Sequence, residues 1–208
     1  MHIKICGITT LDDALAAMEA GADLLGFNFY PPSPRCVEPQ SCASIVARLP
    51  KGVRTVGVFV NARPEHIRLI LDECGLDLAQ LCGDEPPEHL AALGEQAFKV
   101  LHPTGPQDLA AALERYPVRA GSPAWLVDAY RPGEFGGTGQ TADWSLASAL
   151  ASRAPILLAG GLTPANVAAA VEQVRPWGVD VASGVEDSPG RKDPARMAAF
   201  VAAARGTV

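Results

Sequence analysis

The segment KICGIT, residues 4–9, ends a short hydrophobic run at a glycine, and three later segments repeat this pattern. They are QLCGDE at residues 80–85, LAGGLT at residues 158–163 and ASGVE at residues 182–186. Each pattern predicts a strand that stops at a small-residue turn and is followed by a helix. In parallel α/β proteins the loops after the carboxyl ends of the strands surround one mouth, so these turns predict where the site lies.

Strand-like and helix-like segments alternate eight times along the chain. Strands are predicted at residues 2–6, 23–29, 55–60, 77–81, 98–101, 125–128, 156–159 and 179–182. Helices are predicted at residues 11–20, 39–49, 64–74, 87–93, 107–116, 144–151, 164–174 and 194–204. Eight such units predict a single-domain (β/α)₈ TIM barrel, with residues 1–208 as one catalytic domain. The alternation is also compatible with an open doubly wound sheet.

Several predicted helices carry residues that are typical of helix ends. Four residues stand as N-caps just ahead of a helix: Thr10, Asn61, Thr163 and Asp193. Gly21 and Gly75 directly follow two helices, where glycine commonly ends a helix.

The composition favours a globular protein in a reducing compartment. Apolar residues make up 48% and charged residues 19% of the chain. A net charge of −6 argues against a nucleic-acid partner. The chain has no run of 18 apolar residues, so no membrane span is predicted. The sequence begins with a strand-like segment rather than a secretory leader. Its five cysteines include no C-x-x-C pair, which together with their odd number predicts a cytoplasmic location.

Cys6 is the first candidate for chemistry. Side chains alternate along a strand, so Lys4 and Cys6 point to one side while Ile3 and Ile5 point to the other. In a barrel the first pair faces the interior, where the Lys4 charge would favour a Cys6 thiolate. The alternative is that Cys6 is only a small buried hydrophobic residue.

Asp128 and Arg35 are further candidates beside strand ends. Asp128 ends an apolar run, where partial burial would raise the pKa of a carboxyl group, although it could also cap a turn or pair with Arg131. Arg35 follows the second strand on a proline-rich loop and could bind a carboxylate, although most loop arginines are only solvated. The GGTG segment at residues 136–139 is typical of a flexible or anion-binding loop.

Two small-residue turns predict an anion site. Gly160 and Gly161 end the seventh strand, and Ser183 and Gly184 end the eighth. Barrel enzymes commonly bind phosphate with the loops after these two strands, through backbone N–H groups.

Taken together, these motifs resemble the phosphoribosylanthranilate isomerase family of tryptophan biosynthesis. The resemblance rests on KICGIT, GADLLGFNF with a downstream SPR, VGVF, QL-x-GDE, GGTG, LAGGLTPANV and GVDVASGVE, in the order and spacing of the family. It implies a (β/α)₈ barrel. It also implies an Amadori rearrangement of N-(5-phosphoribosyl)anthranilate to 1-(2-carboxyphenylamino)-1-deoxyribulose 5-phosphate.

The resemblance also implies roles for individual residues. Cys6 matches the general base of the family, Asp128 its general acid, and Arg35 the residue that binds the anthranilate carboxylate. The residues that match the substrate-binding turns and the aspartate of the GVD motif are Gly160, Gly161, Ser183, Gly184 and Asp180. The substrate supplies its own iminium as electron sink, so neither a metal nor an organic cofactor is expected. The four histidines show no paired metal-ligand spacing.

The sequence departs from the family pattern in two places. Cys82 stands where the family usually has histidine, and we expect that histidine to pack beside the aromatic ring rather than to move protons. Cys36 stands where an aromatic residue is common.

The residues are also compatible with three other interpretations. One is a dual-substrate phosphosugar isomerase that also serves histidine synthesis, but that type is expected to use two aspartates, and the first strand offers none. The others are a catalytically silent phosphate binder and a subunit of a tryptophan-pathway assembly. The expected oligomeric state is a monomer or homodimer.

Overall fold

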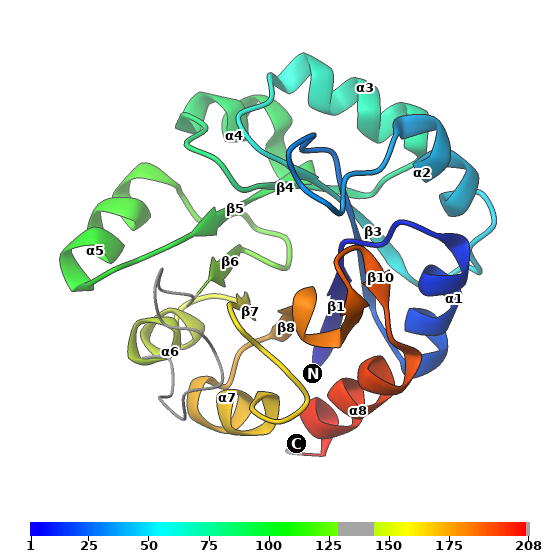
Figure 1. Ribbon diagram of the computed structural model, residues 1–208. Coiled ribbons are helices and arrows are strands. Elements are labelled where there is room, and N and C mark those ends of the chain that lie inside the picture. The colour runs from blue at the N-terminus through cyan, green and yellow to red at the C-terminus, as the bar shows by residue number, and fades with distance from the viewer. Residues whose placement is uncertain (129–143, 207–208) are drawn as a thin grey trace.

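The chain folds into a closed barrel of parallel strands surrounded by helices, as Figure 1 shows in a view along the barrel. The computed structural model describes residues 1–128 and 144–206. The barrel strands are β1 His2–Cys6, β2 Leu24–Asn28, β3 Arg54–Phe59, β4 Leu78–Leu81, β5 Ala97–Leu101, β6 Trp125–Asp128, β7 Ile156–Ala159 and β8 Gly178–Val181. Each pairs with its neighbour in the chain, and β8 pairs with β1. The predicted (β/α)₈ barrel is therefore confirmed, and the open sheet is excluded.

Helices follow the strands within the described residues. They are α1 Leu11–Ala20, α2 Pro39–Val46, α3 Pro64–Cys74, α4 Pro87–Leu93, α5 Pro106–Arg115, α6 Ser145–Ala151, α7 Val167–Val174 and α8 Pro194–Arg205, with the 3₁₀ turns η1 Gly94–Gln96 and η2 Ser183–Val185. In residues 1–128 and 144–206, none of these helices combines the length and the apolar character that crossing a membrane requires.

Two layers of buried side chains build the core. The barrel interior holds Leu24, Val56, Leu78, Phe98, Val100, Leu126, Leu157 and Ala159. A larger layer, which includes Ile3 and Ile5, fills the space between the strands and the helices. Because side chains alternate along a strand, the layer of one residue fixes the direction of its neighbours.

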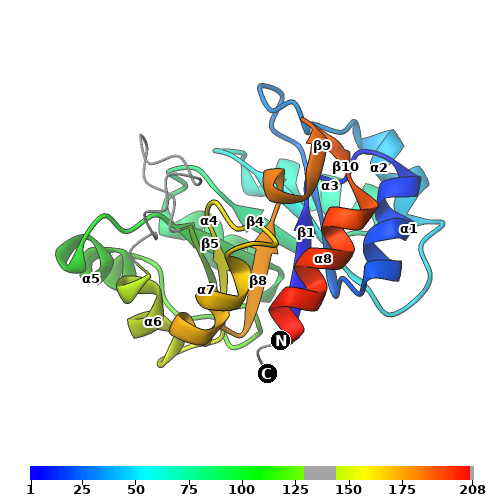
Figure 2. The same ribbon diagram turned by 60° about the horizontal axis from the view of Figure 1, so that its bottom comes forward.

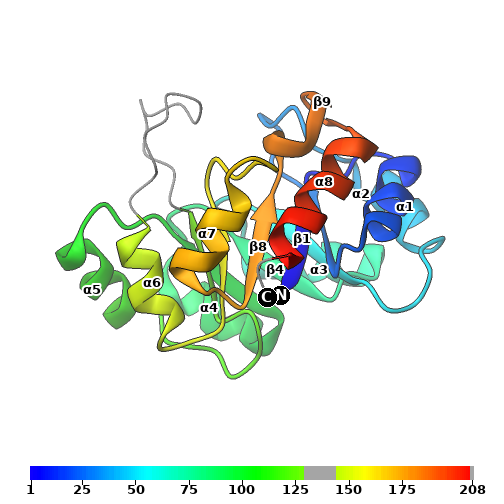
Figure 3. The ribbon, with the colours of Figure 1, turned by 90° about the horizontal axis from the view of Figure 1, so that it is seen from below.

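A short antiparallel hairpin was not predicted from the sequence. It consists of β9 Glu186–Ser188 and β10 Arg191–Lys192, between β8 and α8. Figures 2 and 3 show β9 at the end of the barrel opposite the N-terminus, on the side to which the strands point. The hairpin therefore belongs to the mouth of the barrel.

The predicted helix ends are confirmed in part. Thr10 caps α1 by accepting from the Asp13 N–H at 3.1 Å, and Asp193 caps α8 by accepting from two backbone N–H groups. Gly21 and Gly75 end α1 and α3 in the left-handed region, with φ values of 103° and 67°.

Two predicted caps are wrong for local reasons. Asn61 does not cap α3, because its side chain accepts from the Asp84 N–H at 2.7 Å in the neighbouring loop. Thr163 does not cap α7, because this helix begins only at Val167. Its N–H donates instead to the Asn166 side chain at 2.8 Å, which forms a turn and delays the helix to Val167.

Candidate active site

The pleat of the strands turns three predicted site residues into the barrel. Cys6, Asp128 and Asp180 lie on β1, β6 and β8, and their strand neighbours belong to the outer layer. These neighbours are Ile5, Val127, Val179 and Val181. Cys6 and Asp128 are the last residues of their strands and are partly exposed, so both side chains lie at the mouth.

Lys4 lies one step below Cys6, as the strand alternation predicts. Its Nζ donates to Oδ1 of Asp180 at 2.8 Å, and its side chain is fully buried. A β-carbon on Gly26 would lie only 2.9 Å from the Cys6 Sγ and 3.1 Å from the Lys4 Nζ, so a glycine is needed at this position of β2. Burial opposes the charge on Lys4, but Asp180 and Cys6 together raise the pKa of Lys4 above its ordinary value.

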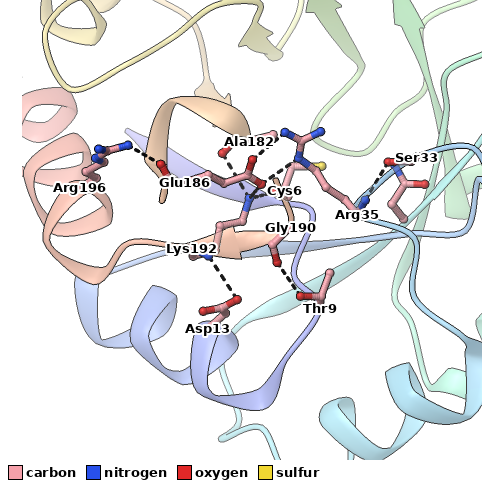
Figure 4. Close-up of polar contacts among 11 residues, drawn as sticks. Cys6, Thr9, Asp13, Ser33, Arg35, Ala182, Glu186, Gly190, Lys192 and Arg196 are labelled. Carbon is pink, nitrogen blue, oxygen red and sulfur yellow. Dashed lines mark hydrogen bonds and ion pairs between the residues drawn. The ribbon is translucent and has the colours of Figure 1, made fainter. Parts of the chain in front are cut away.

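Arg35 lies on a stiff loop after β2. Three of the four residues at positions 31–34 are prolines, which fix the backbone φ angle. The Asn28 side chain accepts from the Tyr30 N–H at 2.7 Å, and the Ser33 hydroxyl accepts from the Arg35 N–H at 3.2 Å. These contacts aim the arginine over the mouth, where Figure 4 shows it beside Cys6.

The guanidinium of Arg35 is held by a carboxylate that the sequence analysis missed. Arg35 donates from Nε to Oε1 of Glu186 at 2.8 Å and from Nη2 to Oε2 at 2.6 Å. The Arg35 side chain is 22% exposed, while that of Glu186 is 4% exposed. Hydrogen bonding to Glu186 raises the pKa of Arg35, which therefore carries its charge at any pH of interest.

Lys192 is a second residue of the mouth that was not predicted. Its Nζ donates to the Cys6 carbonyl at 2.5 Å, to the Ala182 carbonyl at 3.2 Å and to Oε1 of Glu186 at 2.8 Å. Three acceptors match the three protons of an ammonium group. A turn signal was present in the sequence, because Pro-Gly at residues 189–190 is typical of a turn between two short strands.

Asp128 faces the mouth from the other side of the barrel. Its Oδ2 lies 3.9 Å from Nδ1 of His102, and the Asp128 side chain is 30% exposed. The alternative partner Arg131 and the GGTG segment at residues 136–139 lie outside the described residues.

The two predicted anion-binding turns lie against each other. Gly160 and Gly161 adopt positive φ angles of 99° and 63°. Ser183 and Gly184 form η2, and a β-carbon on Gly184 would overlap the carbonyl oxygen of Leu162. The turn after β8 therefore packs directly on the turn after β7, and only glycine allows this approach.

Cys82 occupies the far wall of the same mouth. The Gln80 Nε2 donates to the Cys82 Sγ at 3.2 Å, and burial raises the pKa of the Cys82 thiol to about 12. Cys6 and Lys4 both act on this thiol electrostatically, so the three side chains share one neighbourhood. Cys82 is therefore a neutral thiol at physiological pH.

A buried lysine fixes the backbone on both sides of Cys82. Lys99 Nζ donates to the carbonyls of Leu81 at 3.1 Å and Gly83 at 2.5 Å, and to Oε2 of Glu85 at 3.0 Å. This network holds the loop after β4 in place. Across residues 1–128 and 144–206, no three histidine, cysteine or acidic side chains form a group that could hold a metal ion.

Comparison with known sequences identifies relatives over the full length. The family model described as PRAI, N-(5'phosphoribosyl)anthranilate (PRA) isomerase, matches residues 3–203. The N-(5'-phosphoribosyl)anthranilate isomerase of Geobacter sulfurreducens is 48% identical over 206 residues, which cover 99% of both chains.

Solved structures with the same fold include three isomerases. The phosphoribosyl anthranilate isomerase of Thermotoga maritima matches with a TM-score of 0.88 and 40% identity, over 99% of both chains. An isomerase in complex with reduced 1-(o-carboxyphenylamino)-1-deoxyribulose 5-phosphate matches with a TM-score of 0.86 and 38% identity, again over 99% of both chains. Monomers generated from the dimeric Thermotoga maritima enzyme match with a TM-score of 0.84 and 38% identity over 99% of both chains.

Proposed function

We propose a residue-level mechanism for this chain from the premise that it belongs to the N-(5'-phosphoribosyl)anthranilate isomerase family. The chain is accordingly an isomerase of tryptophan biosynthesis, which confirms the family predicted from its motifs. Its reaction converts an aminoaldose into an aminoketose and needs one proton donor and one proton acceptor. The proposal concerns which side chains fill these two roles and which bind the substrate.

Asp128 acts as the general acid. In its protonated form it donates to the ring oxygen of the ribose, the ring opens, and the anthranilate nitrogen becomes an iminium. The place of Asp128 at the end of β6, facing the mouth and only 30% exposed, supports this role.

Cys6 acts as the general base. Its thiolate removes the C2′ proton, which the neighbouring iminium has made acidic, and the resulting enolamine tautomerises to the ketose. Lys4, Arg35 and Lys192 bring three positive charges close to Cys6, and this placement supports the assignment of Cys6 as the base. The iminium is the electron sink, so the mechanism requires neither a metal nor an organic cofactor.

The two ends of the substrate are anionic, and each has its own binding group. Arg35 binds the anthranilate carboxylate. The paired turns with Gly160 and Gly161 and with Ser183 and Gly184 bind the 5-phosphate; the isomerase whose complex was solved carries a reduced product of this kind. Asp180, whose Oδ1 is held by Lys4, contacts the sugar through Oδ2.

Family membership also bears on the domain content, the cellular location and the oligomeric state of the protein. We propose that residues 1–208 act as one catalytic domain in a reducing cytoplasm, consistent with five free cysteines. A dimeric relative exists in Thermotoga maritima, and for this chain a monomer or a homodimer remains the proposal.

One observation carries most of the support. Cys6 and Asp128 come from different strands, yet each is the last residue of its strand and lies at the same end of the barrel. The test is the loss of anthranilate fluorescence as substrate is consumed, compared among the wild type, Cys6→Ala and Asp128→Asn. Loss of a positioned acid or base lowers the rate by a factor on the order of 10²–10⁴.

The control is Cys42→Ala, which removes a buried thiol from α2 on the outside of the barrel and keeps wild-type activity. A Cys6→Ala protein as fast as the wild type would rule out the assigned base. A wild type that binds the substrate without converting it would indicate a silent phosphate binder.

A further inference from the structure

Glu186 is a buried carboxylate that takes no part in the proposed proton transfers. Its two oxygens accept three hydrogen bonds, two from Arg35 and one from Lys192 (Figure 4). Burial disfavours its charge, but the bonds from Arg35 and Lys192 hold the pKa of Glu186 below the ordinary glutamate value. Glu186 is therefore an anion beside the site at neutral pH.

The hairpin that carries Glu186 is anchored from three sides. The Thr9 hydroxyl donates to the Gly190 carbonyl at 2.7 Å, and the Lys192 N–H donates to Oδ2 of Asp13 at 3.3 Å. Arg196 on α8 donates to the Glu186 backbone carbonyl. These bonds connect the hairpin to the loop before α1, to α1 itself and to α8. The carboxylate of Glu186 thus has a fixed position.

Glu186 in turn selects one orientation of the Arg35 guanidinium. It occupies the edge formed by Nε and Nη2, which leaves three N–H donors at the Nη1 and Nη2 end. That end is a second fork for a carboxylate. The arginine stem also lies against the turn after β1, because a β-carbon on Gly7 would be 2.5 Å from the Arg35 Cδ.

Lys192 keeps the cluster of Arg35, Glu186 and Lys192 positively charged overall. A carboxylate paired with Arg35 alone would cancel its charge and weaken its attraction for an anion. Lys192 adds a second cation on the other side of Glu186, so two positive charges face one negative charge. The group keeps a net positive charge while its arginine is held rigidly.

We propose that Glu186 is a positioning residue that orients Arg35 toward the carboxylate of the substrate and thereby sets the preference for a carboxylated aromatic amine. This inference rests on the proposed function of Arg35. It assigns to Glu186 no contact with the reacting atoms. Removing its charge therefore affects the recognition of the substrate carboxylate far more than the chemical step.

The experiment compares the natural substrate with its aniline counterpart, N-(5-phosphoribosyl)aniline, which lacks the carboxyl group. The measured quantity is the ratio of kcat/KM for the two substrates, with product quantified by chromatography. In Glu186→Gln the KM for the natural substrate rises about 10-fold or more while kcat stays within about 3-fold, because hydrogen bonds between charged groups are lost. The kcat/KM for the aniline substrate is unchanged, so the ratio falls about 10-fold.

Three further variants distinguish a positioning role from damage to the fold. Glu85→Gln removes an equally buried carboxylate that pairs with Lys99 and does not touch Arg35, so its ratio stays at the wild-type value. If Glu186→Gln fails to fold, Glu186→Asp keeps the charge beside Lys192 but shortens the reach to Arg35, and the ratio falls by an intermediate factor. In an Arg35→Met background, Glu186→Gln changes the ratio no further.

The outcomes distinguish this inference from the proposed function. Suppose that the wild type has a kcat/KM ratio well above one and that Glu186→Gln has the same ratio. This result overturns the positioning role of Glu186 but not the proposed function. An equal loss toward both substrates also overturns the positioning role, since that is the result of a general structural defect. A wild-type ratio near one contradicts the carboxylate-binding role of Arg35 itself, and a wild type inactive on both substrates contradicts the proposed function.

Discussion

At the scale of single residues, Cys6 and Cys82 lie near each other at the mouth, but different charged groups surround them. Cys82 has a pKa of about 12 because it is buried, so it stays protonated and a poor nucleophile. Both residues are half-buried, but Cys6 also lies near the charges of Lys4, Arg35 and Lys192. Because Cys82 stays protonated, Cys6 is the one of these two thiols that we expect to react with oxidants and alkylating reagents.

Dilute hydrogen peroxide is expected to inactivate the protein through Cys6, without a disulfide between Cys6 and Cys82. Mass mapping at half-inactivation should find Cys6 oxidised to the same extent as the loss of activity. Under peroxide, the Cys82→Ala variant should be inactivated at the same rate as the wild type, because the Cys82 thiol takes no part in the inactivation. Full loss of activity with Cys6 unmodified would contradict this expectation.

The positions of Cys6 and Asp128 in the fold could be predicted from the sequence, because each ends a strand. Cys6 and Asp128 face the mouth because each ends an alternating or apolar segment, and such a pattern is visible locally. Glu186 could not be assigned in this way. Its partner Arg35 lies 151 positions earlier in the chain, and only the closed barrel brings the two together.

At the scale of elements, the two glycine turns after β7 and β8 pack against each other with no side chain between them. Gly184→Ala would force a β-carbon into the carbonyl of Leu162. The variant is expected to lose about 1–3 kcal/mol of unfolding free energy. It should also show a raised KM, since the two turns must separate.

The matched control for this variant is Gly105→Ala at the start of α5. A β-carbon on Gly105 meets no atom within 4 Å, so thermal unfolding and KM should stay close to the wild type. Both quantities are measured by thermal denaturation and steady-state assay. A Gly184→Ala protein with wild-type melting temperature and KM would show that the two turns are not in tight contact.

Element boundaries were predictable where a local signal fixes them. Strands β1, β6 and β7 and helices α1, α3 and α4 have the predicted limits. The hairpin of β9 and β10 was missed because strands of three and two residues are too short to show a period. Helix α2 ends at Val46 rather than at residue 49, since bonds from the N–H groups of Arg48 and Leu49 tighten its last turn into 3₁₀ geometry.

At the scale of the whole molecule, buried ion pairs hold two loops on opposite sides of the mouth. Glu85 in the loop after β4 pairs with Lys99, and Glu186 in the segment after β8 pairs with Arg35 and Lys192. Hydrogen bonds lower the pKa of Glu85 and of Glu186 despite burial. A carboxylate with a lowered folded-state pKa stabilises the fold above its unfolded-state pKa of about 4.3. That stabilisation is lost as the pH falls through the folded-state value.

The melting temperature is therefore expected to fall steadily as the pH is lowered below about 4.3. Glu85→Gln should melt lower than the wild type at neutral pH, because Lys99 loses its charged partner, and the two curves should converge in acid. Circular dichroism melts at a series of pH values measure this. Parallel curves for the two proteins would contradict the role of Glu85.

In the proposed mechanism, the Cys6 thiol on β1 and the Asp128 carboxyl group on β6 act on opposite sides of one bound sugar. The most direct measurement is a crystal structure of this protein with reduced 1-(o-carboxyphenylamino)-1-deoxyribulose 5-phosphate. We expect Cys6 and Asp128 both to contact the ribulose portion, Arg35 to bind the carboxylate and the glycine turns to bind the phosphate. A complex in which the ribulose portion touches only one of the two residues would contradict it.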